Sequence, residues 1–339
     1  MVLVVNDENE PGIHEWVSKT YAKLSTEERF RHKLVTNGFY FSLIPLTNAG
    51  NFQSFIDQLE ATPPLEYRHN LLSGYDNVFE MYREEYPEMK KPDWDVALIS
   101  AANYVNQLKS IFGEERTDVD IETRAYQYVI DPSTLKELIV GHIRWFWEEH
   151  LKPEWERVKP LLDESARAFS NLNLSRMSRE ELVRFITGKE KNDSKWSGLI
   201  NSVSEVYFLP NAHIGPYIRT AFVRDAAYVV FGAHLPEGSN IHIPELDRAE
   251  IVSKLSALAD ETRLTILQLL GARGEMRSTE IMDEIKLSQP STSRYLAQLT
   301  ANGYLNEKRI NSAKVYSLNL ERIQKTLQAV EAFLLSNTK

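Results

Sequence analysis

The sequence predicts a mainly α-helical protein with small β parts. We expect a helical N-terminal domain that ends in a few strands, followed by a smaller domain of short helices and one β-hairpin. The chain has 339 residues, which suits two domains better than one. Helix-start signals and apolar stripes at helical spacing fill its first half. Short β-branched and aromatic runs bounded by proline and glycine appear near residue 200, and two alternating segments lie close to the C-terminus.

Several helix starts are marked by side chains that can bind the first free backbone amides. Ser25 with Glu28, and Ser178 with Glu181, have the capping-box spacing, in which a hydroxyl and a carboxylate each bind one backbone N–H. Asp131-Pro132 offers a capping carboxylate followed by a proline that suits the first helical turn. These three signals predict helices that begin at or just after each site.

Apolar spacing indicates how far the helices extend. A stripe of apolar residues predicts one helix over residues 93–112. Two further helices are expected over about 135–150 and 152–171, and Gly188 is expected to end another.

The pattern changes after Trp196. Residues 203–209 and 227–231 are β-branched and aromatic and are bounded by proline and glycine, so we expect strands there. The turn-rich stretch 235–240, with Pro244 after it, marks the domain boundary. The sequence therefore predicts a mostly helical domain over residues 1–243 and a second domain over residues 244–339.

Composition excludes several classes of site. The chain has no cysteine, which rules out disulfides, zinc ribbons, thiolate metal sites and cysteine nucleophiles. Its N-terminus lacks the basic and long apolar regions of a secretory signal, and no apolar run approaches the ~20 residues that span a bilayer. We therefore expect a soluble, cytoplasmic protein that does not bind membranes.

The net charge of −9 is unevenly distributed along the chain. Residues 245–339 hold 13 Lys and Arg against 12 Asp and Glu, so the acidity belongs to the N-terminal domain. Between residues 286 and 314, five basic residues face only one acidic residue, Glu307. Such a local excess of positive charge is typical of a surface that contacts phosphates.

The C-terminal domain has short, closely spaced elements. Its helices and strands are expected at about 251–259, 262–270, 279–285, 289–302, 304–310 and 313–318. Gly271 and Gly303 are expected to end the second and fourth helices, and Asn311-Ser312 is expected to join two strands in a hairpin. Helices, turn, helix and hairpin in this order predict a winged helix-turn-helix, whose second helix lies in the major groove of double-stranded DNA.

The helix expected in the groove begins with polar side chains. Ser288 can cap it, and Pro290 fits its first turn. Basic residues of the hairpin, the wing, would hold the flanking DNA backbone. The side chains predicted to contact DNA are Ser288, Gln289, Ser291, Thr292, Ser293, Arg294, Tyr295, Lys308, Arg309 and Lys314.

Three segments of this domain resemble a known family. Residues 258–270 (LADETRLTILQLL) are similar to the opening motif of ArsR-type repressors, and residues 287–296 (LSQPSTSRYL) are similar to their recognition helix. The wing over residues 308–318 is similar as well. The resemblance covers only the last quarter of the chain. It implies a homodimer that reads a palindromic operator, paired through terminal helices, where Ile323, Leu327, Val330 and Leu334 form a fitting stripe.

The metal sites of that family do not match this chain. Metal-sensing members carry a Cys-x-Cys before the recognition helix, where Arg277 and Thr279 stand here. The other family site uses histidine and acidic ligands on the last helix, and residues 321–335 contain no histidine. We therefore expect no metal and no cofactor, although an unknown small-molecule effector fits a regulator.

The role of the N-terminal domain stays open between two classes. In the first class, it is a sensor or dimerisation module of a regulator. In the second, it is an enzyme or a small-ligand-binding domain, and the winged helix is accessory to it. The sequence lacks a Gly-x-Gly-x-x-Gly motif, a Walker loop and a Gly-x-Ser-x-Gly motif, which favours a regulator without enzymatic activity. As a third possibility, the winged helix binds a protein.

One N-terminal helix carries candidate site residues. His142, Glu149 and His150 are compatible with a metal or acid-base site, and the aromatic residues from Trp145 to Trp155 with an apolar pocket. The spacing is not that of a helical His-Glu-x-x-His motif, so a packed aromatic helix is favoured.

Overall fold

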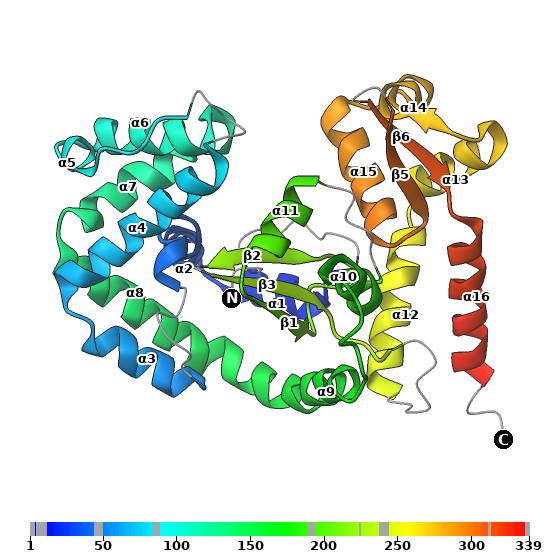
Figure 1. Cartoon of the computed structure of the whole chain (residues 1–339), viewed down its shortest axis with the longest axis horizontal. Helices are drawn as coiled ribbons and strands as arrows, with labels where there is room; N and C mark the ends of the chain where they lie inside the picture. The colour runs from blue at the N-terminus through cyan, green and yellow to red at the C-terminus, as the bar shows by residue number, and fades with distance from the viewer. Residues whose placement is uncertain are drawn as a thin grey trace. The chain divides into compact units, whose positions relative to one another are not determined.

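The computed structural model describes residue 4 and residues 12–43, 50–83, 89–188, 194–223, 225–236, 244–310 and 313–335. It is mostly helical with small β parts, as the sequence predicts, and its described residues form two three-stranded sheets (Figure 1). The chain divides into two compact units: residues 1–7 with 19–155, and residues 8–18 with 156–339. The predicted boundary, the stretch 235–240 with Pro244 after it, lies mostly outside the described residues, and the division into residues 1–243 and 244–339 stays a prediction.

The first unit is built from helices. Its elements are α2 (Thr26–Lys33), η1 (Leu34–Gly38), η2 (Tyr40–Leu43), α3 (Phe52–Ala61), α4 (Pro64–Tyr82), α5 (Trp94–Ala97), α6 (Ala101–Phe112), η3 (Glu114–Arg116), α7 (Val119–Val129), α8 (Pro132–Phe146) and η4 (Trp147–Leu151). η1 and η4 are π-helical turns. The helices pack around one apolar core that includes Phe39, Leu71, Tyr104 and Ile139. Helices α1 (Glu15–Lys23) and α9 (Lys152–Ser170) each have residues in both units.

The predicted helix starts are confirmed. Ser25 and Ser178 each form a complete capping box, at the start of α2 and of α10 (Arg179–Thr187). The carboxylate of Asp131 accepts hydrogen bonds from the amides of Ser133 and Thr134, with Pro132 in the first turn of α8. Gly188, in the left-handed region at φ 64°, ends α10 as expected.

The single helix predicted over residues 93–112 is wrong. The structure has two helices there, α5 and α6, because Ser100 takes an extended conformation and its hydroxyl caps α6 at the amide of Asn103. Two apolar residues of the predicted stripe, Val96 and Ile99, are 40% and 71% exposed at this break.

The second unit contains a mixed sheet. Strands β1 (Glu205–Asn211), β2 (Arg219–Val223) and β3 (Ala226–Gly232) lie in the order β1-β3-β2, with β1 parallel and β2 antiparallel to β3. β1 and β3 confirm the expected strands, whereas β2 was not predicted. Helices α10 and α11 (Ser194–Ser202) contribute Val183, Trp196 and Ile200 to a core with Ala227 and Val229 of β3.

Residues 12–18, the N-terminal segment, belong to the second unit and contact the loop after β1 through their backbone. The amide of His14 donates to the carbonyl of His213 at 3.0 Å. Gly215 has a φ of 60°, and a Cβ atom there would lie 1.9 Å from the carbonyl oxygen of Gly12. Only glycine allows this approach, because it combines a positive φ with the absence of a side chain.

The winged helix lies at the C-terminal end of the second unit. Its elements are α12 (Pro244–Leu258), α13 (Glu261–Arg273), β4 (Met276–Arg277), α14 (Ser278–Ile285), α15 (Gln289–Ala301), β5 (Leu305–Ile310), β6 (Ala313–Leu318) and α16 (Leu320–Leu335). The strands form an antiparallel sheet in the order β4-β6-β5. Helices α12 and α16, yellow and red in Figure 1, run beside each other. Ile266, Leu270, Ile281, Leu296 and Tyr304 form the centre of the core.

One predicted helix end in this domain is wrong. Gly271 does not end α13, which continues to Arg273 and stops at Gly274, where φ is 79°. Gly303, also at φ 79°, follows the end of α15 as expected. Asn311-Ser312, the predicted hairpin turn, lies outside the described residues.

In the part of the chain that the structure covers, every helix is too short or too polar to cross a membrane.

Candidate nucleic-acid interface

Helix α15 begins with a side-chain cap. The hydroxyl of Ser288 accepts a hydrogen bond from the amide of Ser291 at 3.4 Å and donates to the hydroxyl of Ser291 at 3.0 Å. Pro290 occupies the first turn, where a missing N–H costs nothing. The remaining free amides of this turn and the positive end of the helix dipole favour a bound anion.

The turn before α15 is sharp because of one residue. Lys286 ends α14 with φ 54° and ψ 41°, in the left-handed region, which few residues other than glycine adopt. This places an exposed lysine directly before the N-terminus of α15. Lys286 was counted in the local positive charge but was not predicted as a site residue.

The predicted contact residues of α15 and its cap fall into three groups by exposure. Ser288, Gln289, Ser293 and Arg294 are exposed. Thr292 is only 2% exposed, so it lies inside the domain and is not placed to touch a ligand. Ser291 and Tyr295 are half-buried, and Tyr295 packs against the core of the domain.

Arg294 lies beside an aromatic ring. Its guanidinium carbon is 5.4 Å from the centroid of the Tyr295 ring, a cation–π distance. Since the Tyr295 ring packs on the core, this contact restricts an otherwise flexible side chain on the exposed face of α15.

Two of the three predicted wing cations have acidic partners. The Nζ atom of Lys308 is 2.6 Å from Oε1 of Glu275, and that of Lys314 is 2.9 Å from Oε1 of Glu307. Arg309 is exposed and lies opposite Lys314 in the register of β5 and β6. The positive charge of the wing is therefore partly neutralised within the domain.

The sequence predicted the wing lysines but not their acidic partners. Glu307 is opposite Tyr316 and hence diagonal to Lys314, a relation that the hairpin register alone gives. Glu275 is 33 residues from Lys308, and only the folded domain brings the two together.

Arg263 is part of the interior and not of the interface. It is 6% exposed, and its guanidinium donates hydrogen bonds to the carbonyls of Ser256 and Ala257 and to Oε1 of Gln298.

The candidate residues of the first unit are packed on aromatic rings. His142 is 3% exposed, its Nε2 lies 3.0 Å from Nδ1 of His32, and burial lowers its pKa to about 4. The ring of His150 lies 5.3 Å from Trp145 and 5.1 Å from Phe146. Within the described ranges His142, Glu149 and His150 do not come together as metal ligands. The packing fits an aromatic helix.

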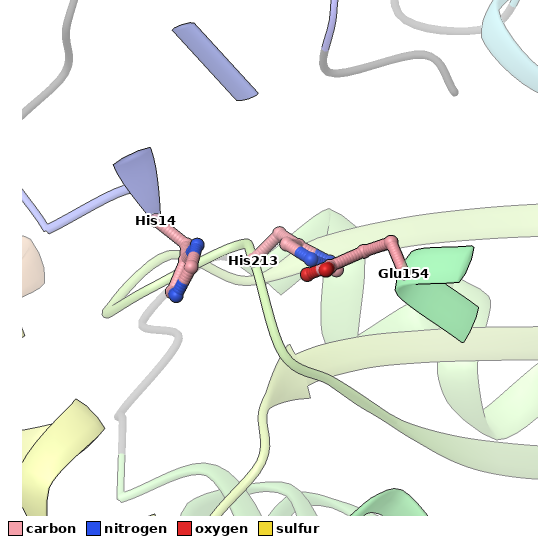
Figure 2. A group of neighbouring side chains, drawn as sticks. All are labelled: His14, Glu154 and His213. Carbon is pink, nitrogen blue, oxygen red and sulfur yellow. The ribbon is translucent and has the colours of Figure 1, made fainter. Parts of the chain in front are cut away.

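A second histidine pair holds the N-terminal segment. Figure 2 shows His14 and His213, drawn with Glu154 from the first turn of α9. The two imidazole centroids are 5.5 Å apart with perpendicular rings. Nδ1 of His14 accepts a hydrogen bond from the amide of Trp16 at 3.1 Å, so the neutral ring carries its proton on Nε2. In that state Nε2 is a donor and not a metal ligand.

Comparison with known proteins identifies the C-terminal region. The model of the family "Bacterial regulatory protein, arsR family" matches residues 260–307, which run from the start of α13 into β5. This match contains the whole of α15 and ends one residue before Lys308, the first of the predicted wing contacts.

Three curated relatives each match between 21% and 24% of the chain. The arsenic resistance transcriptional regulator ArsR2 of Pseudomonas putida is 39% identical over 88 residues, which is 24% of this chain and 76% of that protein. An HTH-type transcriptional regulator of Methanocaldococcus jannaschii is 32% identical over 75 residues, 22% of this chain and 84% of its own. The arsenical resistance operon repressor of Staphylococcus xylosus is 31% identical over 72 residues, 21% of this chain and 68% of its own.

Proposed function

Because the chain belongs to the ArsR family of bacterial regulatory proteins, we propose that it is a repressor that binds a palindromic operator in double-stranded DNA as a homodimer. Its family domain is a DNA-binding transcription-regulator domain. Repression, dimerisation and the contact residues are the proposed part.

The exposed N-terminus of α15 carries the proposal. Gln289, Ser293 and Arg294 offer hydrogen-bond donors on its accessible face, and the basic wing follows it in the chain. In this arrangement α15 enters the major groove, Gln289 and Arg294 reach base edges, and Arg309, Lys308 and Lys314 contact phosphates.

DNA selection tests this assignment. The full chain is mixed with random-sequence duplexes, the retained fragments are sequenced, and affinity for them is measured at several salt concentrations. The double variant Arg294→Ala, Lys308→Ala should bind the selected duplex at least tenfold more weakly, as expected for a lost base contact and a lost phosphate contact. Arg116→Ala with Lys159→Ala removes the same charges elsewhere and should change nothing. Unchanged affinity and salt dependence in the first variant would refute the DNA surface.

An apolar face on α12 and α16 supports the homodimer. Leu327, Leu334 and Leu335 of α16 are 55%, 68% and 59% exposed, and Val252 of α12 is 54% exposed. These side chains belong to neighbouring helices, so they form one surface that a second copy can cover. Sedimentation of Leu327→Glu with Leu334→Glu should give a monomer and the wild type a dimer. A monomeric wild type would contradict the proposal.

We further propose that residues 1–243 bind an effector and have no enzymatic activity. The chain has no cysteine, so the effector is not a metal bound through thiolates. Effector binding changes the orientation of the two recognition helices, which must match half-sites about one helical turn apart. In titrations with a library of small metabolites, one should change operator affinity without being consumed. Its chemical conversion by the protein would favour the enzyme alternative.

We expect the repressor to act in the cytoplasm, where its operator lies.

A further inference from the structure

Two buried side chains tie α12 to the rest of the winged helix. Arg263 of α13 donates from Nε to the carbonyl of Ala257 at 2.6 Å and from Nη2 to that of Ser256 at 2.9 Å. Its third hydrogen bond runs from Nη1 to Oε1 of Gln298 on α15, at 3.0 Å. One guanidinium therefore links the end of α12 to the inner face of α15.

Tyr304 makes the corresponding link to α16. This tyrosine follows α15 and is fully buried. Its hydroxyl lies 2.9 Å from the carbonyl oxygen of Lys254 on α12 and 3.4 Å from the hydroxyl of Thr326 on α16. Its own amide donates to the carbonyl of Leu299 in the last turn of α15.

These contacts complete the C-terminus of α12. A helix end leaves four carbonyls without partners in the helix. Here the carbonyls of Leu255 and Leu258 accept from the amides of Ala259 and Asp260, and Arg263 binds the other two. The last turn of α12 is thus held by hydrogen bonds to α13 and, through the same guanidinium, to α15.

Arg263 is difficult to replace in this role. A buried charge is tolerated only when it is hydrogen-bonded, and the planar guanidinium reaches three acceptors in fixed directions. A lysine has one nitrogen and cannot hold both carbonyls and Gln298 in the same geometry. Gln298 lies one turn after Arg294 on α15, so a rotation of the helix that frees Gln298 also moves Arg294.

We propose that Arg263 and Tyr304 are positioning residues for DNA binding, which fix the end of α12 against α15 so that the orientation of α15 follows that of α12. The proposal rests on the function proposed above. It makes α12, the helix that continues the chain from residues 1–243, the element through which the rest of the protein acts on the DNA-reading helix.

The test uses the full chain with two DNA probes. One is a duplex selected by the wild-type protein from random sequences, and the other is a scrambled duplex of equal length. Tyr304→Phe keeps the ring and removes the hydroxyl. Arg263→Lys keeps the charge and removes the planar guanidinium that reaches three acceptors. Each should lose about tenfold in affinity for the selected duplex, the size of one lost base contact. Affinity for the scrambled duplex and its salt dependence should be unchanged, because the phosphate contacts remain.

Arg273→Gln is the matched control. Arg273 lies on the same helix, is exposed and pairs with Glu284, so both affinities should stay at the wild-type value. Measurements well below the thermal midpoint of each variant keep the population folded, so a loss of stability alone does not change affinity. If both variants keep the full preference for the selected duplex, or lose affinity for both probes equally, the positioning role is overturned. A wild type that selects no duplex would instead refute the proposed function and the inference with it.

Discussion

Lys308 and Lys314 are each held by a carboxylate of their own domain. An exposed ion pair of this kind contributes at most about 1 kcal/mol, so a DNA phosphate can replace the carboxylate. The displaced acid nevertheless stays close to the DNA and repels it. On the proposed interface, Glu275 and Glu307 therefore weaken binding to DNA of any sequence. Tight binding then depends on base contacts by α15, which only some sequences provide.

Removing one of these carboxylates should raise non-specific affinity. In Glu275→Gln, Lys308 is free to bind a phosphate without competition. Binding to a scrambled duplex should tighten, and the slope of log affinity against log salt should become steeper by about one. Fluorescence anisotropy over a range of salt concentrations measures both. Glu331→Gln makes the same change of charge on α16, and an equal effect there would show that only net charge matters.

Two buried ionisable groups of the first unit have opposite effects on its stability. Burial raises the pKa of Glu122 to about 8 from its ordinary 4.5, and the charge of Asp118 adds to this. Burial lowers the pKa of His142 to about 4 from 6.5, and Arg31 adds to that shift. In both cases the folded unit keeps the uncharged form over a range of pH in which the unfolded chain is charged.

The sign of each pH dependence follows from these pKa values. Above pH 4.5 unfolded Glu122 releases its proton, so stability falls as pH rises towards 8. Below pH 6.5 unfolded His142 gains a proton, so stability falls as pH drops towards 4. The two slopes, at most about 1.4 kcal/mol per pH unit each, cancel between 4.5 and 6.5 and leave a plateau there.

Glu122→Gln should remove the alkaline slope. The amide resembles the protonated carboxyl group in shape and is uncharged. The free energy of unfolding should therefore be constant from pH 6.5 to 8, a range in which that of the wild type decreases. Urea unfolding at several pH values, followed by the fluorescence of the first unit's tryptophans, measures the difference. Glu115→Gln, at an exposed site in η3, should behave as the wild type. If Glu122→Gln keeps the wild-type slope, another group causes it.

The sequence predicted the helix starts at which a side chain caps the next few backbone amides. The caps at Ser25, Asp131 and Ser178 were predictable, since each needs only the next three residues. Residues 93–112 were misread, because an apolar stripe does not reveal that Ser100 caps a new helix. β2 was missed because five residues give a weak alternating pattern, and pairing with β3 makes it a strand.

The attachment of the N-terminal segment to the sheet of the second unit depends on Gly215. In Gly215→Ala, the new methyl group would meet the carbonyl of Gly12, so the segment must move away. Gly188 has nearly the same φ, but its Cβ would meet nothing within 4 Å. Gly188→Ala should therefore cost only the backbone strain, about 1–2 kcal/mol, and Gly215→Ala considerably more. Thermal unfolding measures the loss of stability in each variant. Equal losses would show that the segment moves away from Gly215 without a cost in stability.

Over the whole molecule, the sequence predicted the C-terminal winged helix better than the N-terminal region. The winged helix has its own periodicity, turns and local charge, so a helix capped by Ser288 could be predicted without a structure. The burial of Thr292 could not, because it depends on how α15 packs on the core. For the N-terminal region, composition and periodicity predicted helices, whereas the packing of His142 on His32, 110 residues away, required the fold.

The salt dependence of operator binding should reflect two copies of the chain. Each protomer exposes five cations at the proposed interface: Lys286, Arg294, Lys308, Arg309 and Lys314. Since Arg294 is proposed to meet a base, the other four would give a log–log slope of about −3.6 for one protomer and about −7 for a dimer if all of them met phosphates. A slope steeper than about −5, together with two chains per duplex in sedimentation, is the expected result. A shallow slope with one chain per duplex would contradict the dimeric complex.

The contact between Gly12 and Gly215 joins two segments that are made at different times during synthesis. Residues 12–18 leave the ribosome before their partners at 213–215, which are made about 200 residues later, roughly 10 to 40 seconds at usual rates of translation. Residues 19–155 have all the partners of their own unit well before that moment. The unit that carries α15 therefore has to join residues 12–18 to partners that are made long after the first unit has all of its own.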